Sequence, residues 1–430
     1  MGKRKQNKSA IDLSNISDTD SVSSTATALS DLTLAHETEN VNSLDAVVER
    51  CLDSLDKKSS RLKALSELVN AFEGNTLLPF IENKCITLLD EYITSLKKGK
   101  GSPTEACLAS RAIGLLAITV GTGSTAKEIM EQTLPHIERA LLTGSDALKI
   151  SVLDCLAVTT FVGANNWEET EKSMKIMWDI IQLKPGTKGN KPSTVVLSSA
   201  LSGWSLLLTT IGSWRINLDN WTEPISGLCT LLEHDDRAVR VAAGEAIAIT
   251  FEIVIGDKLS SENNDLVGSD TENYKPKWFK QLLSSKAKIM NQVVVLSMEA
   301  GGKSAVDKKN LNNQRDLFQK IYKYFLDKEC PETSTKISKG HGLLVTSTWT
   351  QLIQLNFFKR YLASGFLKHA QENELLQDIF NLTPDRNDHL SSKEKRVNRS
   401  SEYKERTRER NKYRQMAQQR KGGHIFAYDE

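Results

Sequence analysis

The stretch that decides the fold runs from Asp236 to Ile247 and reads DRAVRVAAGEAI. It follows the pattern D-x-x-V-R-x-x-A-x-x-A-I, in which apolar residues recur every three or four positions. This spacing predicts a helix with one apolar face. The small residues in it let a neighbouring helix approach closely, and Asp236 and Arg240 are placed to pair between successive units. We therefore expect a helix that stacks against other units of the same kind.

The same pattern resembles the second helix of a HEAT repeat, and a weaker copy of it surrounds Asp146. Outward from this stretch, apolar residues with helical spacing recur from residue 43 to about residue 330, separated by short polar breaks. The sequence thus predicts an all-α, armadillo- or HEAT-like helical repeat solenoid. We expect it to carry a disordered N-terminal tail and a basic C-terminal helix.

Helix start signals support this interpretation at two places. Residues 102–105, Ser-Pro-Thr-Glu, form a capping box with proline at the first helical position. Residues 166–169, Asn-Trp-Glu-Glu, follow the same logic. Both predict helices that satisfy their own first backbone N–H groups.

Composition divides the chain into four predicted parts. Residues 1–42 are a Ser/Thr-rich acidic tail that holds too few apolar residues to order itself. Residues 43–330 form the repeat domain, and residues 331–384 form a compact C-terminal helical domain. Residues 385–430 form a basic, RNA-binding tail helix.

Three features imitate functional sites, and each has a structural interpretation. The charge-free stretch 192–214 is long enough to cross a membrane, but its many hydroxyls favour a buried central helix. Residues 121–126, GTGSTA, imitate a dinucleotide-binding turn, but the segment before them is helical, so we expect a turn between helices. Trp204, Trp214 and Trp221 are expected to anchor helix packing, with ligand stacking as the alternative.

Composition argues against an enzyme or a metalloprotein. The six cysteines form no CxxC pair and the seven histidines form no HxxxH, which argues against a structural metal site or a disulfide framework. No cofactor motif and no catalytic residues stand out. Met1–Ala10 is followed by no apolar signal segment, so we expect a reducing compartment, cytoplasm or nucleus, a monomer, and no membrane contact.

The strongest functional signal is the basic tail. Residues 391–421 hold twelve Lys or Arg and four Glu, a net charge of +8, whereas the whole chain carries +2, so the remainder is acidic. In a helix, Arg406, Arg410 and Arg414 form one ridge, and Lys404, Arg408 and Lys412 form a second. Such a helix, with no apolar stripe, suits RNA phosphates. A nuclear localisation signal or a solvated charged helix is the alternative. The predicted RNA-binding residues are Lys393, Lys395, Arg396, Arg399, Lys404, Arg406, Arg408, Arg410, Lys412 and Arg414.

Several C-terminal motifs resemble the interferon-related developmental regulator family. They are Asp307-Lys308-Lys309 with Gln314-Arg315-x-x-Phe318-x-x-Ile321, Trp349, Gly365-Phe366-x-x-His369, the run from Asn373 to Pro384, and the basic tail that begins near Ser391. The resemblance covers most of the chain, from about Ser43 to Arg420. It implies an armadillo-like helical fold without enzymatic activity.

The resemblance also implies two lines of function, which stay open here. One is binding to ribosomes and rRNA, with the C-terminal helix in the path of mRNA and tRNA, so that translation is repressed or held inactive. The other is transcriptional co-regulation in the nucleus, with the solenoid surface binding protein partners such as co-repressor complexes. Both fit a protein present in cytoplasm and nucleus.

Overall fold

The computed structural model describes residues 44–98, 102–182, 191–212, 221–255, 277–301, 304–338 and 342–382. The chain divides into two compact units, Met1–Ala46 and Val47–Glu430. Of the first unit, residues 44–46 are described, and they are helical. The predicted disordered tail of residues 1–42 and the predicted basic helix of residues 385–430 lie outside the described residues.

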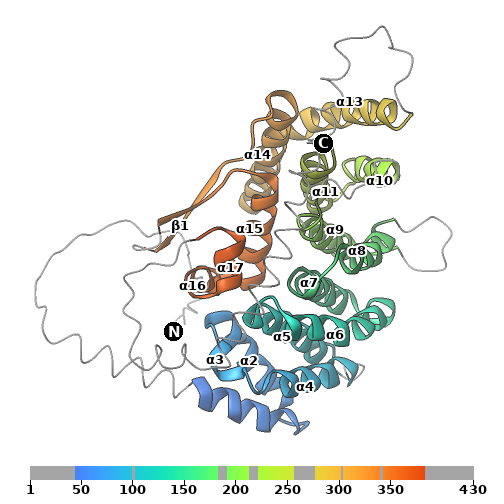
Figure 1. The fold of residues 1–430 in the computed structure, drawn as a ribbon. Helices are drawn as coiled ribbons and strands as arrows, with labels where there is room; N and C mark the ends of the chain where they lie inside the picture. Colours follow the sequence, from blue (N-terminus) through green and yellow to red (C-terminus); the bar gives the residue numbers. More distant parts are fainter. Residues whose placement is uncertain are drawn as a thin grey trace, which may run out of the picture. The chain divides into compact units, whose positions relative to one another are not determined.

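The second unit is an all-α helical repeat solenoid to which one β-hairpin is added (Figure 1). The helices of the repeats are α2 (Arg61–Gly74), α3 (Leu78–Ile81), α4 (Cys85–Lys98), α5 (Pro103–Val120), α6 (Ser124–Thr143), α7 (Asp146–Gly163), α8 (Trp167–Ile181), α9 (Thr194–Leu208), α10 (Thr222–Leu231), α11 (Arg237–Thr250), the π-helix η3 (Phe251–Ile255), α13 (Lys277–Ser297) and α14 (Ala305–Asp327). They are followed by β1 (Thr333–Ser338), β2 (Gly342–Thr346), α15 (Trp349–Leu362), the 3₁₀ turn η5 (Ala363–Gly365), α16 (Phe366–Glu372) and α17 (Glu374–Ile379).

The predicted helix starts are confirmed by the cap geometry. The Ser102 hydroxyl accepts a hydrogen bond from the Glu105 N–H at 3.3 Å. The Asn166 side chain accepts from the Glu169 N–H at 2.9 Å, and the Glu169 carboxylate accepts in return from the Asn165 N–H at 2.8 Å. Each cap satisfies donors that the first helical turn leaves without a partner.

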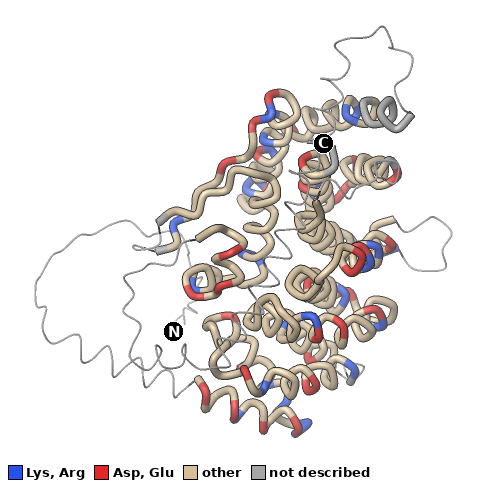
Figure 2. Tube along the Cα trace, in the orientation of Figure 1, with Lys and Arg blue, Asp and Glu red and all other residues tan. Residues whose placement is uncertain are grey.

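Helices α2, α5, α7, α9 and α11 pack one against the next and form a central layer. Helices α4, α6, α8 and α10 cover one side of this layer, each packed on a central helix. Figure 2 shows that charged residues gather on the outer helices and turns, while the central helices are drawn mostly in tan. A helix covered on two sides needs apolar residues all round, which explains the composition of α5, α7 and α9.

This burial accounts for the membrane-like segments. Helix α5 is the one described helix that is long and apolar enough to cross a bilayer, and α9 is also apolar but shorter. Both are members of the central layer, where α5 packs against α2, α4 and α7. The interpretation of residues 192–214 as a buried central helix is confirmed over Thr194–Leu208.

The small residues of the Asp236–Ile247 stretch act as the sequence predicts. A Cβ atom placed at Gly244 would lie 2.9 Å from the Phe318 ring, so only glycine lets α14 approach α11 this closely. The predicted pairing of Asp236 with an arginine of another unit is not found. Asp236 caps its own helix, accepting from the Ala238 N–H at 2.8 Å.

The segment expected to be helical throughout residues 331–384 begins instead with an antiparallel hairpin. Strand β1 pairs with β2 in a register that places Thr335 opposite Leu344 and Lys336 opposite Leu343. The β-branched Thr333, Thr335 and Ile337 alternate along β1, a spacing that favours a strand. The boundaries of this predicted domain stay a prediction.

The elements after the hairpin form a second cover on the central layer, which we call the C-terminal layer (α15, η5, α16 and α17). Helix α15 packs on α9 and α11, and η5 packs on α2. In Figure 1 this layer lies to the left of the central helices, and α6, α8 and α10 lie to the right. This side of the central helices is therefore covered by the chain itself.

Candidate functional site

The C-terminal layer precedes the basic tail in the sequence. Its first anchor is a set of contacts with the end of α2. The backbone of Gly365 lies against the carbonyl oxygen of Glu73, where any side chain would collide. The buried His369 ring donates from Nε2 to the carbonyl oxygen of Phe72 at 2.9 Å, and its Nδ1 has no hydrogen-bond partner among the described residues. Burial lowers the pKa of His369, so the ring stays neutral. Lys368 Nζ adds a bond of 2.7 Å to Asn75 Oδ1.

A second anchor joins the end of α15 to α5. The guanidinium of Arg111 donates to the Glu73 carboxylate at 2.5 Å and to the carbonyl oxygen of Tyr361, and it lies 4.7 Å from the centre of the Tyr361 ring. The Tyr361 hydroxyl donates to the carbonyl oxygen of Arg111 at 3.2 Å. A Cβ atom at Gly114 would collide with this hydroxyl, so the glycine makes room for the ring.

A third anchor joins α15 to α7. Arg360 forms two parallel hydrogen bonds to Asp154, at 2.7 and 2.8 Å, and Asp154 is 8% exposed. Burial alone would lower the pKa of Arg360, but the hydrogen bond and charge of Asp154 outweigh it and raise the pKa. Two parallel bonds fix orientation as well as distance.

The start of α15 is held by a residue far away in the sequence. The Glu252 carboxylate, on η3, accepts from the N–H groups of Trp349 and Thr350 and from the Thr350 hydroxyl, each at 2.7 Å. A carboxylate at a helix N-terminus satisfies orphan donors and complements the helix dipole. The π-helical turn of η3 therefore supplies a cap for a helix 97 residues later.

At the other end of the layer, Asn373 performs two tasks. Its side-chain oxygen caps α17 by accepting from the Leu375 N–H at 2.9 Å, and its amide donates to the carbonyl oxygen of Ile118 at 3.1 Å. Helix α17 is thus tied to α5, and it ends at Ile379, shortly before the predicted tail. The motif residues Gly365, His369 and Asn373 therefore position the C-terminal layer.

Arg240 forms a further cluster at the junction of α11, α13 and α14. Its guanidinium donates to the carbonyl oxygens of His234 and Asp235, at 3.0 and 2.9 Å, and to the Glu299 carboxylate at 3.0 and 3.2 Å. It also donates to the Gln314 side chain, at 3.1 Å. Arg240 thus pairs with an acidic residue of the next unit, as the sequence predicts, but that residue is Glu299 and not an aspartate.

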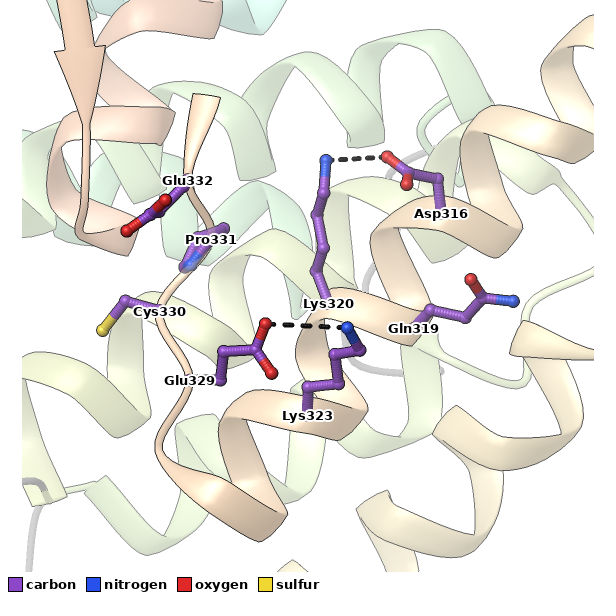
Figure 3. Close-up of a pocket in the computed structure, with 8 residues that line it drawn as sticks. All are labelled: Asp316, Gln319, Lys320, Lys323, Glu329, Cys330, Pro331 and Glu332. Carbon is purple, nitrogen blue, oxygen red and sulfur yellow. Dashed lines mark hydrogen bonds and ion pairs between the residues drawn. The ribbon is translucent and has the colours of Figure 1, made fainter. Parts of the chain in front are cut away.

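The described residues contain a shallow pocket between α14 and the segment before β1 (Figure 3), with a volume of about 460 Å³. Two lysines line it, and both are paired: Lys320 lies 2.7 Å from Asp316 and Lys323 lies 3.6 Å from Glu329. With these charges neutralised locally, the pocket offers no built site for an anion.

No group of His, Cys, Asp and Glu within the described residues is arranged to hold a metal ion. Burial raises the pKa of the Cys155 thiol to about 12 and that of Cys51 to about 11, so neither is a thiolate nucleophile at neutral pH. Residues 121–123 form the expected turn between α5 and α6, and residues 124–126 are the first turn of α6.

The ten predicted RNA-binding residues, from Lys393 to Arg414, all lie outside the described residues. Of the three tryptophans, Trp204 packs between Trp178 and Trp221, with ring centres 5.3 and 5.7 Å apart, and Trp214 lies outside the described residues. The packing role is confirmed for the first and third.

Several anchors escaped the sequence analysis, although a signal for them exists. Arg111, Asp154 and Glu252 are lone charges within segments that are otherwise apolar. A charge on such a segment needs a partner once it is buried, which marks it as half of a long-range pair. The sequence does not identify the other half.

Comparison with known proteins gives the family. The model "Interferon-related developmental regulator (IFRD)" matches residues 15–325, and "Interferon-related protein conserved region" matches residues 373–418. Mouse Interferon-related developmental regulator 2 is 27% identical over 361 residues, covering 81% of this chain and 75% of that protein. Human Interferon-related developmental regulator 1 is 27% identical over 380 residues, covering 84% and 78%. A designed armadillo repeat protein, YIII(Dq)4CqI, aligns with a TM-score of 0.40 and 16% identity, over 64% of this chain and 99% of that chain. The chain belongs to the interferon-related developmental regulator family.

Proposed function

We propose that this chain is a non-enzymatic regulator of gene expression that binds ribosomes or RNA through its basic C-terminal tail and holds translation inactive. The observation that carries the proposal is the charge of the tail, +8 over residues 391–421 on a chain whose net charge is +2. Such a segment binds phosphates through counterion release. The ten predicted contact residues, Lys393 to Arg414, all fall within the matched region 373–418.

The C-terminal layer, which precedes the tail in the sequence, is anchored to the central helices. Asn373 lies in the same matched region and ties α17 to α5, and the described chain continues to Leu382. The anchors at His369, Arg360 and Tyr361 hold the C-terminal layer on three central helices, α2, α7 and α5. If the tail binds RNA, the folded body is then held next to the bound site. This suits a protein that obstructs a channel.

The experiment that tests the proposal is a binding series against purified ribosomes at increasing salt. Replacing Arg406, Arg410 and Arg414 together by Glu should weaken binding and flatten the log–log salt slope by roughly 2 to 3 units, because each phosphate contact contributes about −0.7 to −0.9. The matching change at Lys404, Arg408 and Lys412 tests the second ridge. If one ridge alone matters, the helix lies with one side on RNA; if both matter, RNA surrounds it.

The matched control reverses three charges on the body. Lys97, Lys172 and Lys175 are exposed on α4 and α8, and changing all three to Glu alters the net charge by the same amount as each tail triple. Binding equal to wild type is expected for this control. Unchanged affinity in both tail triples would remove the tail from the mechanism.

The second candidate function is a nuclear transcriptional co-regulator, with the body as a protein-interaction scaffold and the tail as an import signal. The outer helices favour it, because they carry the charged residues that a scaffold presents. Sucrose-gradient profiles of the intact chain and of a chain ending at Pro384 separate the two. Loss of ribosome co-sedimentation on truncation supports the first, whereas tail-independent recovery with deacetylase complexes supports the second.

A further inference from the structure

Strand β2 is an edge strand with an apolar outer face. The side chains of Leu343 and Val345 are 59% and 56% exposed, while Leu344 between them is buried. On the β1 side of the hairpin, helix α16 packs on the strand, and the Gln371 amide donates to the carbonyl oxygen of Ile337 at 3.4 Å. The sheet has two strands within the described residues, and β2, reading GLLVT, carries no charge that would block pairing. An unpaired edge beside an apolar face is suited to a further strand.

The chain itself contains a matching segment. Residues 424–430 read HIFAYDE, a run in which the bulky His424, Phe426 and Tyr428 alternate with smaller or branched residues. Aromatic and β-branched residues in alternation favour a strand. Gly422-Gly423 separates this run from the basic segment, and two glycines in a row disfavour a helix that would continue through both. These residues lie outside the described part of the chain, and the alternation is a property of their sequence.

We propose that residues 424–430 add to the hairpin as a third strand, beside and antiparallel to β2. Phe426 and Tyr428 would then cover Leu343 and Val345. Charge complementarity selects the direction. Lys336 is exposed and lies opposite Leu343, at the turn end of the hairpin, and only the antiparallel direction brings Asp429-Glu430 to that end.

The length of chain between the two segments suits this contact. Helix α16 packs on β1 through the bond from Gln371 to Ile337 and is followed by α17. The described chain ends soon after this contact, at Leu382. From Leu382 to Phe426 the chain takes 44 steps, which as a random coil would span roughly 33–40 Å, and a helix over residues 391–421 alone would measure about 46 Å. Tethering at this length gives an effective concentration in the mM range. A strand that binds with a Kd of about 100 μM in trans would thus be docked most of the time in cis.

The covalent connection also favours residues 424–430 of the same chain over those of a second copy. One strand and a few side chains bury far less than the roughly 1,200 Å² of a stable interface, so free dimers gain too little. The tethered segment needs no such area. Docking would hold the basic segment 391–421 at both ends, on α17 and on the hairpin, whether or not that segment binds RNA.

Hydrogen exchange of the full-length protein tests the proposal, with mass spectrometry that resolves single β2 amides. The amides of Gly342–Thr346 that point away from β1 should exchange at least 10-fold more slowly in wild type than in a Phe426→Ser/Tyr428→Ser variant. Ala427→Ser, on the other face of the strand, should keep the slow exchange. All three changes lie outside the described residues, and a urea midpoint equal to that of wild type checks that each variant is folded.

Three results would overturn the proposal. Equal exchange in wild type and the double variant means that the segment does not dock. Slow exchange that appears only at high protein concentration means that a second copy supplies the strand. Loss of protection in Ala427→Ser as complete as in the double variant means that Phe426 and Tyr428 do not hold it.

Discussion

Reversing the charge of Arg240 should destabilise the folded state by about 3 kcal/mol. The Arg240 side chain is 11% exposed, and its guanidinium donates to two carbonyl oxygens, to Glu299 and to Gln314. Gln314 is fully buried and also donates to Glu299, at 2.6 Å. In an Arg240→Glu variant these acceptors lose their donor, and two carboxylates then face each other.

The magnitude follows from the burial of the pair. Breaking a buried ion pair by changing one partner costs about 3–5 kcal/mol, because the other charge is left without compensation. Glu299 is 33% exposed, so water solvates part of the orphaned carboxylate and the lower end applies. With a urea dependence of about 3 kcal/mol per M, the midpoint of unfolding should fall by about 1 M.

The assay is urea unfolding followed by circular dichroism, with three comparison variants. Arg237→Glu reverses a neighbouring charge whose one hydrogen bond among the described residues is 3.4 Å long, to the Asp307 carbonyl oxygen, and it should cost less than Arg240→Glu, about 1 kcal/mol. Arg240→Lys keeps the charge but loses the several N–H donors of the guanidinium. Its loss of stability should therefore lie between those of Arg237→Glu and Arg240→Glu. Arg240→Glu combined with Glu299→Arg should recover part of the loss. An Arg240→Glu midpoint equal to that of wild type would refute the role of this residue at the junction.

Three further predictions concern the C-terminal half. A chain that ends at Pro384 should keep the thermal midpoint of wild type, since the predicted core stops near Leu382; a fall of many degrees in a scanning calorimeter would contradict this. Gly365→Ala should lower the free energy of unfolding by about 1–3 kcal/mol, because the added Cβ would meet the Glu73 carbonyl oxygen, whereas Gly74→Ala, with open space around it, should show no such clash. The pKa of His369 is lowered by burial, so the neutral ring stabilises the fold fully above the ordinary value near 6.5, and this contribution is lost as the pH falls below it. Urea midpoints measured from pH 8 to pH 5 should therefore drop more steeply in wild type than in His369→Gln; parallel curves would show that this group does not titrate across the transition.

The repeat architecture could be predicted because its determinants are local. The Asp236–Ile247 pattern and the caps at Ser102 and Asn166 each require a few neighbouring residues, and helical spacing encodes them directly. The charge-free stretch that became α9 was also correctly interpreted, since its many hydroxyls fit a helix buried in protein. These features depend on which face of a helix is apolar.

The C-terminal layer could not be predicted in the same way. The two bonds between Arg360 and Asp154 span 206 residues, and the one bond between His369 and Phe72 spans 297. No periodicity links such positions. The hairpin was missed for another reason: Thr333, Thr335 and Ile337 alternate as a strand should, but the segment is short and polar, and the helical pattern on both sides dominated its interpretation. For the predicted RNA-binding residues, spacing and charge supply the prediction, and the ribosome experiment is its test.

The contact between His369 and Phe72 also has a consequence for the order in which the protein is made. A ribosome that adds roughly 5–20 residues per second needs about 15–60 s to progress from one residue to the other. During that interval α2, α5 and α7 have been synthesised, but the face that the C-terminal layer will cover is still open to water. Each newly made chain therefore passes through a period in which it presents apolar surface to chaperones or to other nascent chains. Slower elongation through residues 73–369 would lengthen this period, so expression yield should respond to codon choice in a region far from any functional residue.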